Sequence, residues 1–212
     1  MKRLILFTAA WLILGSAGSL FHRDQVVERC ERGGNAEQLP GNPSRPDTVP
    51  RRPGHCSVDL HTQQTTERED VAGDEVLGAA AIYVFDLLTQ NPDRSAASPN
   101  CGRAGHRVVP YDFETAFSFR FAVPRVDGWR VAGLPFTKKH LFHGALKRST
   151  VDWRTVFDRF RSVPLASLAD ACSTLPQAWV EIGQEVLAHL TSVHDHWSEF
   201  ELETTISLGS SL

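Results

Sequence analysis

The sequence predicts an α+β domain that is mainly helical and carries one small β-hairpin, preceded by an N-terminal segment without regular structure. Three patterns support this fold class. Apolar residues recur at helical spacing at both ends of the C-terminal two-thirds of the chain. A turn signal separates two short predicted strands between them, and five prolines fall within fourteen residues upstream. The ordered domain is therefore expected over residues 73–212.

The totals exclude few classes of function. A chain of 212 residues suffices for one domain plus an extension, and a hydrophobic share of 42% is normal for a globular protein. The net charge of -3 gives no sign of nucleic-acid binding. The four cysteines form no CxxC pair, which argues against a zinc ribbon, and we expect ordinary thiols at Cys30, Cys56, Cys101 and Cys172.

Residues 1–20 form a hydrophobic segment with the order of a secretory signal. Lys2 and Arg3 precede an apolar run from Leu4 to Leu14, and small residues follow it. The run is too short to span a bilayer comfortably. The alternative interpretation is a misplaced start codon, so that the stretch has no targeting role.

Residues 21–72 are predicted to be a disordered linker rich in proline and arginine. Neither helical nor strand periodicity persists through its proline cluster. Such composition is typical of a linker with polyproline character, and it carries little specificity as a ligand for a proline-binding module. The cluster consists of Pro40, Pro43, Pro46, Pro50 and Pro53.

Order is expected to begin with an amphipathic helix over residues 74–90. Asp74 and Glu75 suit its positively polarised N-terminal end, and Asn91-Pro92 ends it. Two short strands are predicted near residues 100–103 and 107–111, with a turn at 104–105. The helical stripe consists of Leu77, Ala80, Ala81, Val84, Leu87 and Leu88.

The remainder is predicted to be helical. Asp152 is a candidate N-cap for a helix whose one face carries Trp153, Val156, Phe157 and Phe160. Leu165, Leu168 and Cys172 indicate a shorter helix, and Pro176 suits a first helical turn. A long helix should follow, because six apolar residues repeat at a spacing of three or four and form a core stripe. They are Trp179, Ile182, Val186, Leu190, Val193 and Trp197.

The stretch from Phe85 to Phe119 holds the residues that could carry chemistry. A polar loop with Asp93 and Asn100 follows the first helix, and Asp112 follows the hairpin. Phosphoryl transfer needs one carboxylate to orient or deprotonate a hydroxyl, and an amide with a second carboxylate to hold magnesium. A hairpin folds Asp112 back towards Asp93, so we expect the two to face one shared cleft. The alternative is that Asn-Pro-Asp and Ser-Pro-Asn are ordinary turn sequences.

These motifs resemble the catalytic and metal-binding loops of HipA-like kinases. In that family an N-x-D-R loop ends in N-P-N, an I-D-H-E-x-A-F segment follows a hairpin, and the preceding helix often ends in F-D. The resemblance covers residues 73–208 and includes a helical C-terminal lobe. Its motifs are Phe85-Asp86, Asn91-Pro92-Asp93-Arg94, Ser98-Pro99-Asn100, Pro110-Tyr111-Asp112-Phe113-Glu114, Ala116-Phe117 and Leu175-Pro176-Gln177-Ala178-Trp179.

The resemblance implies a kinase C-terminal lobe over residues 73–212 that uses ATP and magnesium. Asp93 matches the catalytic aspartate and Asp112 the metal-binding aspartate. Ser98 stands where the family usually has asparagine, so Asn100 is the substitute metal ligand that we expect. Phe113 stands where the family usually has histidine, which removes a polar contact.

The lobe that clamps ATP has no counterpart in the sequence. There is no G-x-G-x-x-G, and Lys2 is the only lysine before residue 138. The expected function is therefore a truncated Ser/Thr-type kinase, weakly active or inactive, cytoplasmic, with a protein as substrate or partner and no nucleic acid. The alternative is a non-catalytic helical binding protein, exported or tethered to a membrane through residues 1–20.

Two groups of histidines are expected to be solvated or to cap helices. His189, His194 and His196 lie near the end of the long predicted helix without the spacing of a helical zinc pair. Histidines in a last turn interact favourably with the helix dipole. His140 and His143 are three residues apart, which permits a shared face.

Overall fold

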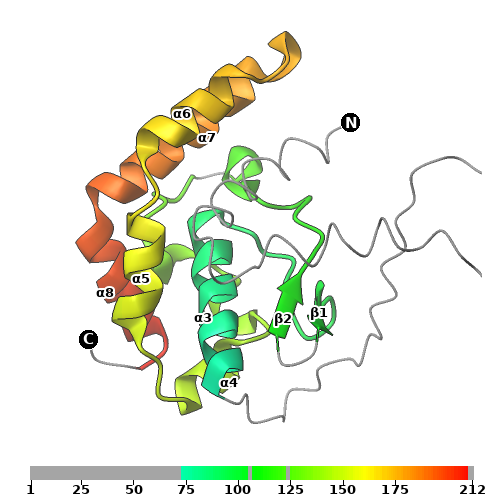
Figure 1. Cartoon of the computed structure of the whole chain (residues 1–212), viewed down its shortest axis with the longest axis vertical. Helices are drawn as coiled ribbons and strands as arrows, with labels where there is room; N and C mark the ends of the chain where they lie inside the picture. Colours follow the sequence, from blue (N-terminus) through cyan, green and yellow to red (C-terminus); the bar gives the residue numbers. More distant parts are fainter. Residues whose placement is uncertain (1–72, 105–106, 123–124, 210–212) are drawn as a thin grey trace, which may run out of the picture.

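The computed structural model describes residues 73–104, 107–122 and 125–209, so the predictions for residues 1–20 and 21–72 lie outside the described residues. The described part is mainly helical and carries one two-stranded antiparallel sheet, as the sequence predicts (Figure 1). Its elements are α3 (Gly73–Leu88), β1 (Cys101–Ala104), β2 (Arg107–Pro110), α4 (His143–Arg148), α5 (Trp153–Arg161), α6 (Leu165–Ser173), α7 (Val180–Asp195) and α8 (Trp197–Ser207), with four short 3-10 turns between them.

Helix α3 is the central element, and α4, α5 and β2 pack around it (Figure 1). The predicted helix over residues 74–90 is confirmed to within two residues at its C-terminal end. It is not amphipathic, however, because every residue from Ala79 to Gln90 is buried. The residues between the predicted stripe positions, among them Ile82, Tyr83 and Phe85, are themselves large and apolar, and a helix that is apolar on all sides is buried.

The two predicted strands are confirmed to within one residue at each end, and Ala104, predicted to lie in the turn, belongs to β1. Cys101 pairs with Pro110 and Ala104 with Arg107, in antiparallel register. Beyond the last ladder pair, the Tyr111 N–H donates to the Asn100 carbonyl at 3.0 Å. The hairpin therefore continues the pairing up to the polar loop that leads into β1.

Helix α5 begins at its predicted cap. The Asp152 carboxylate accepts the backbone N–H of Thr155 at 3.1 Å, which satisfies one of the unpaired donors of the first turn. All four predicted apolar residues of α5 are buried. Phe157 meets Trp197 and Phe200 of α8 with ring centroids 6.4 Å apart, so aromatic packing joins α5 to the C-terminal helix.

The long predicted C-terminal helix is two helices. The backbone leaves helical geometry at His196 (φ -114°, ψ 35°), and Trp197 begins α8. Pro176 precedes the 3-10 turn Gln177–Trp179 and does not lie in the first turn of α7. Of the predicted stripe, Val186, Leu190, Val193 and Trp197 are buried, whereas Trp179 and Ile182 are half-buried.

Burial increases along this stripe from Trp179 to Trp197, and the arrangement of the helices gives the reason. Helix α6 and the first half of α7 run side by side and extend away from the rest of the domain (Figure 1).

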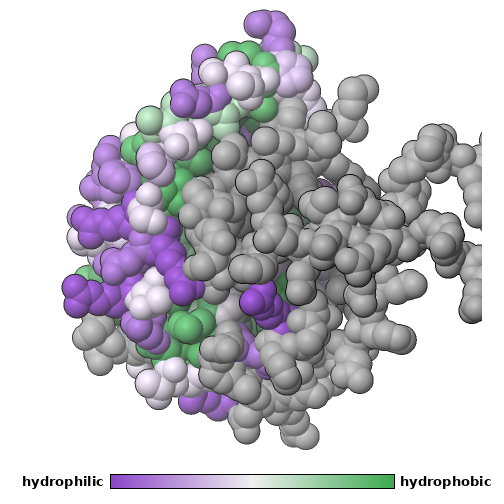
Figure 2. Space-filling model, viewed as in Figure 1, coloured by the Kyte–Doolittle hydropathy of each residue, from purple (hydrophilic) through white to green (hydrophobic). Residues whose placement is uncertain are grey.

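The surface over α5 and α8 is mainly hydrophilic (Figure 2). Among the described helices, none combines the length and the apolar character needed to cross a membrane.

Candidate functional site

A buried carboxylate near the end of α3 organises the candidate site. Asp86 is fully buried and accepts hydrogen bonds from three side chains. They come from Arg94 Nε at 2.5 Å, His140 Nε2 at 2.9 Å and Asn91 Nδ2 at 2.8 Å. Arg94 is itself fully buried, so the ion pair is shielded from water. A buried charge is tolerated only when it is paired and hydrogen-bonded, and both partners meet that condition.

Two hydrogen bonds orient the ring of His140. Its Nδ1 accepts the backbone N–H of Phe142 at 3.2 Å, so the ring hydrogen resides on Nε2 and is donated to Asp86. Arg94 is the cation that pairs with Asp86 in this buried network. Burial alone would raise the pKa of Asp86, but the hydrogen bond from His140 and the charge of Arg94 outweigh it and hold this pKa below its ordinary value.

Arg94 connects α3 to the hairpin. Its Nη1 donates to the carbonyl of Asn100, and its guanidinium lies over the ring of Phe113, 5.3 Å from the centroid. Phe113 packs edge-on against Phe85 of α3, with ring centroids 5.3 Å apart. Phe113 thus stands where the resembled family has histidine and provides a buried aromatic contact to the arginine.

Asp93 lies directly before this anchor and is half-buried. The side-chain amide of Asn100 donates to its carboxylate at 2.9 Å and to its carbonyl at 3.0 Å. The Asp93 N–H is held by Asn91 Oδ1 at 3.3 Å, and the same oxygen accepts the hydroxyl of Thr115. These bonds fix both the backbone and the carboxylate of Asp93.

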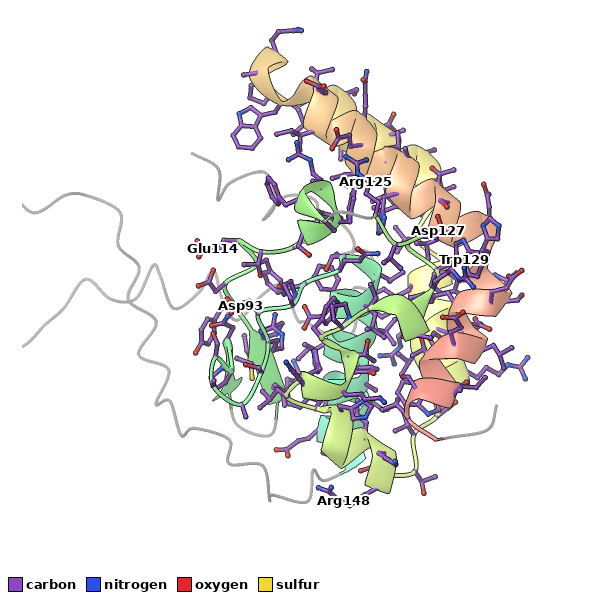
Figure 3. All side chains as sticks on the ribbon, turned by 180° about the vertical axis from the view of Figure 1, so that it is seen from behind. Asp93, Glu114, Arg125, Asp127, Trp129 and Arg148 are labelled. Atoms are coloured by element: carbon purple, nitrogen blue, oxygen red, sulfur yellow. The ribbon has the colours of Figure 1, made fainter. Side chains whose placement is uncertain are left out.

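Asp112 lies on the exposed side of the same region. It follows Tyr111, whose backbone is bonded to Asn100, so the hairpin brings Asp112 to the end where Asn100 and Asp93 meet. Its carboxylate makes no hydrogen bond or ion pair within the described ranges. Figure 3 shows Asp93 and Glu114 on the same side of the molecule. The shared cleft that the sequence predicts for Asp93 and Asp112 stays a prediction.

Ser98, which stands where the resembled family has asparagine, belongs to a tight turn. Its N–H donates to the Ser95 carbonyl at 3.1 Å, and the Ser95 N–H donates back at 3.0 Å. The side-chain amide that contacts the Asp93 carboxylate belongs to Asn100. Its nitrogen is used by Asp93, and its oxygen makes no hydrogen bond within the part of the chain that the structure describes.

Backbone strain is concentrated in this region. Four non-glycine residues adopt positive φ in the described chain, and all of them lie between positions 90 and 117. They are Gln90 (48°), Asn100 (44°), Asp112 (54°) and Phe117 (62°). Left-handed conformations cost an ordinary residue about 1–2 kcal/mol, although Asn and Asp tolerate them better. Such strain clusters at functional sites, where the surrounding structure over-determines it.

The donor chemistry of the region suits a hard cation. Asp112, Asn100 and Asp93 offer only oxygen atoms and the one committed amide nitrogen. Within the described ranges, no three His, Cys, Asp or Glu side chains are grouped closely enough to hold a metal. Magnesium commonly takes one or two protein carboxylates and completes its shell with water and phosphate oxygens, so this donor set fits it better than it fits zinc.

The expectation that the histidines are solvated or capping is wrong for two of them. His140 is buried against Asp86. His189 stacks on Phe119, with ring centroids 4.1 Å apart, and its Nε2 bonds to the Leu88 carbonyl at 2.8 Å. Burial lowers the pKa of His189 below its ordinary value. His194, which is exposed beside Asp195, is solvated as expected.

The network of Asp86, Arg94 and His140 is what sequence reasoning missed. A signal was present, because Asp86 interrupts an apolar run near the C-terminal end of a helix, where the dipole disfavours negative charge. A carboxylate in that position needs a buried cationic partner. The nearest candidate along the chain is Arg94.

Replacing Arg94 with methionine should cost about 3–5 kcal/mol of unfolding free energy, because Asp86 is left buried without its cation. Urea unfolding followed by tryptophan fluorescence measures the loss. The double variant Asp86→Leu, Arg94→Met should recover a large part of it, since neither charge is then stranded. Arg154→Met, at an exposed position of α5, is the control and should change stability by less than about 0.5 kcal/mol. Equal losses in Arg94→Met and Arg154→Met would contradict the anchor role.

The ion pair between Asp86 and Arg94 should make part of the unfolding free energy sensitive to acid. The folded pKa of Asp86 lies below its ordinary value of 3.8, so the pair contributes stability above that value. This contribution is lost as the pH falls through the folded pKa. The difference in unfolding free energy between the natural chain and Asp86→Asn should therefore be constant near neutral pH and should shrink below 3.8. A difference that does not depend on pH would rule out an ionised Asp86.

The sequence and the structure were compared with known proteins. No protein-family model, no curated protein and no solved structure matches the chain. The resemblance of the motifs around Asp93 and Asp112 to HipA-like kinases therefore stays a prediction. What the site can do has to follow from its own residues.

Proposed function

We propose that the described residues form the C-terminal lobe of a HipA-like Ser/Thr-type kinase, with Asp93 as the catalytic base and Asp112 and Asn100 as magnesium ligands. One observation carries the proposal. Asn100 is bonded through its side chain to Asp93 and through its carbonyl to the residue before Asp112. The candidate base and the candidate metal ligands are thus held in one frame, which the buried pair of Asp86 and Arg94 anchors to α3.

The roles follow from the chemistry of each group. Asp93 would accept the proton of the attacking hydroxyl, and the Asn100 amide at 2.9 Å orients its carboxylate for that task. Asp112 and the Asn100 oxygen would hold magnesium, which when bound supplies neutralisation of the charge on the ATP phosphates. Phosphoryl transfer depends on positioning, and a carboxylate held by the Asn100 amide on a backbone bonded to Asn91 suits a reaction of that kind.

The backbone conformation at the two candidate metal ligands also bears on this assignment. Asn100 and Asp112 are both candidate ligands, and both adopt positive φ. A glycine would satisfy these conformations at no steric cost. The carboxylate and the amide at these positions carry oxygen atoms that a magnesium ion can use.

The proposed activity of the chain alone is weak or nil. The sequence contains no phosphate-covering glycine loop and no lysine between Lys2 and Lys138. ATP chemistry belongs in the cytoplasm, which is the compartment that we propose. A non-catalytic binding protein is the alternative, and manganese binding at Asp93, Asn100 and Asp112 separates it from the kinase lobe.

Manganese, a paramagnetic substitute for magnesium, should broaden the backbone amide signals of Asp93, Asn100 and Asp112 in the NMR spectrum of the full chain. Asp112→Gly should abolish the broadening and leave the unfolding free energy unchanged or higher by about 1 kcal/mol, because glycine adopts a φ of 54° without strain.

Asp170→Ala is the matched control for this experiment. It removes an exposed carboxylate from α6, far along the chain from the site, and should leave the broadening intact. Broadening in the natural chain that is centred elsewhere, or that survives Asp112→Gly, would contradict the metal assignment.

Incubation of the purified chain with labelled ATP and magnesium should give no significant autophosphorylation. Losing a single charge-stabilising contact in phosphoryl transfer can cost on the order of a thousandfold, and here the whole phosphate clamp has no counterpart in the sequence. Asp93→Ala and Asp112→Ala serve as the comparison. Clear turnover that both substitutions abolish would show that residues 1–72 supply the clamp.

A further inference from the structure

Four cations lie on one exposed strip beside the candidate catalytic loop. Lys138 and Lys139 belong to the 3-10 turn Thr137–Lys139, and Lys147 and Arg148 end α4. All four residues are exposed, and none forms an ion pair within the described ranges. We call these residues the basic strip. It holds three of the four lysines in the chain.

The strip is placed against the loop by backbone contacts. His140, which follows Lys139, forms an antiparallel bridge with Ser95. The Leu141 N–H donates to the Arg94 carbonyl at 3.0 Å. The strip therefore begins next to the loop that carries Asp93, and it ends at Arg148, at the lower end of the molecule in Figure 3.

Lys138 and Lys147, from the two halves of the basic strip, both lower the pKa of the same histidine. Burial lowers the pKa of His143, and the positive charges of Lys147 and Lys138 lower it further. A Cβ atom at Gly209 would lie 3.7 Å from Lys147 Cε, so the stem of Lys147 runs along the end of α8. The local potential is positive although the whole chain carries a net charge of -3.

Helix-end stabilisation does not account for this charge. Lys147 and Arg148 suit the C-terminal end of α4, but α4 has six residues and both side chains are exposed. Such contacts are small and are screened by salt. Lys138 and Lys139 belong to a single 3-10 turn, where the dipole is smaller still.

We propose that the basic strip binds an acidic segment of a protein substrate, next to the serine or threonine that would reach Asp93. This inference rests on the proposed function. A ligand that places a hydroxyl at Asp93 and carboxylates on the strip has to be one chain, which favours a peptide over a lipid surface. Helix α4 is about 9 Å long, which an extended peptide spans with about three residues. Lysines suit such a ligand, because they pair with carboxylates without a fixed geometry.

The test uses a fluorescent peptide with one serine followed by a run of glutamates, and a matched peptide with glutamines. Fluorescence anisotropy with the full chain at low ionic strength should show binding of the acidic peptide alone, weakening as salt is added. The variant Lys138→Gln, Lys139→Gln, Lys147→Gln, Arg148→Gln should bind it at least about tenfold more weakly.

A second variant removes the same charge elsewhere. Its substitutions, Arg125→Gln, Arg130→Gln, Arg154→Gln and Arg161→Gln, all fall at exposed positions, and it should keep the affinity of the natural chain to within about twofold. Circular dichroism confirms that both variants fold. Equal weakening in the two variants, no preference for glutamate, or tighter binding to phosphatidylserine vesicles or to single-stranded RNA would overturn the proposal.

A spin label at the serine of the peptide tests the position next to the loop. It should broaden the amide signals of Ser95 and Asn100, and broadening confined to other regions would overturn the proposal. The manganese experiment reports on the metal site without any peptide. Peptide binding without manganese broadening would therefore reject the proposed kinase site but not the strip, and the reverse result would reject the strip.

Discussion

The buried ion pair between Asp86 and Arg94 is the constraint on which the rest of the site depends. It ties the last turn of α3 to the loop that follows, and the same guanidinium reaches the Asn100 carbonyl and the ring of Phe113. Asp93 is adjacent to Arg94 in sequence, so its position follows from a contact at which no chemistry takes place. A buried pair is weak evidence for net stability, but it fixes geometry strongly when further hydrogen bonds satisfy both ions.

His140 completes this arrangement from a distance along the chain. It lies 54 residues from Asp86, and its bridge with Ser95 closes the loop from the other side. Both ring nitrogens of His140 are hydrogen-bonded, Nε2 to Asp86 and Nδ1 to the backbone N–H of Phe142. Its contribution is to hold Asp86 and the loop in place, and acid–base chemistry in this region falls to the carboxylates.

Local signals were sufficient to predict much of the fold. The helix α3, the pairing of β1 with β2 and the Asp152 cap each depend on residues close together in the sequence, and each forms within two residues of its predicted position. The break at His196 was missed, because the apolar spacing continues across it from Val193 to Trp197. The order of Asp93, Asn100 and Asp112 could be read from the sequence, and so could the need of Asp86 for a cation, but not the full network around Asp86. Its partner His140 comes from a remote segment that only tertiary packing selects.

The extension formed by α6 and the first half of α7 has a consequence for local unfolding. Its residues lose less apolar surface to the domain than Val193 and Trp197 do, and Trp179 and Ile182 stay half-buried. Segments with few buried apolar contacts open at a lower free energy than the global transition. We therefore expect the tip of this helical pair to open as a separate cooperative unit, with its amide hydrogens exchanging while α3 and the loop anchored to it remain protected.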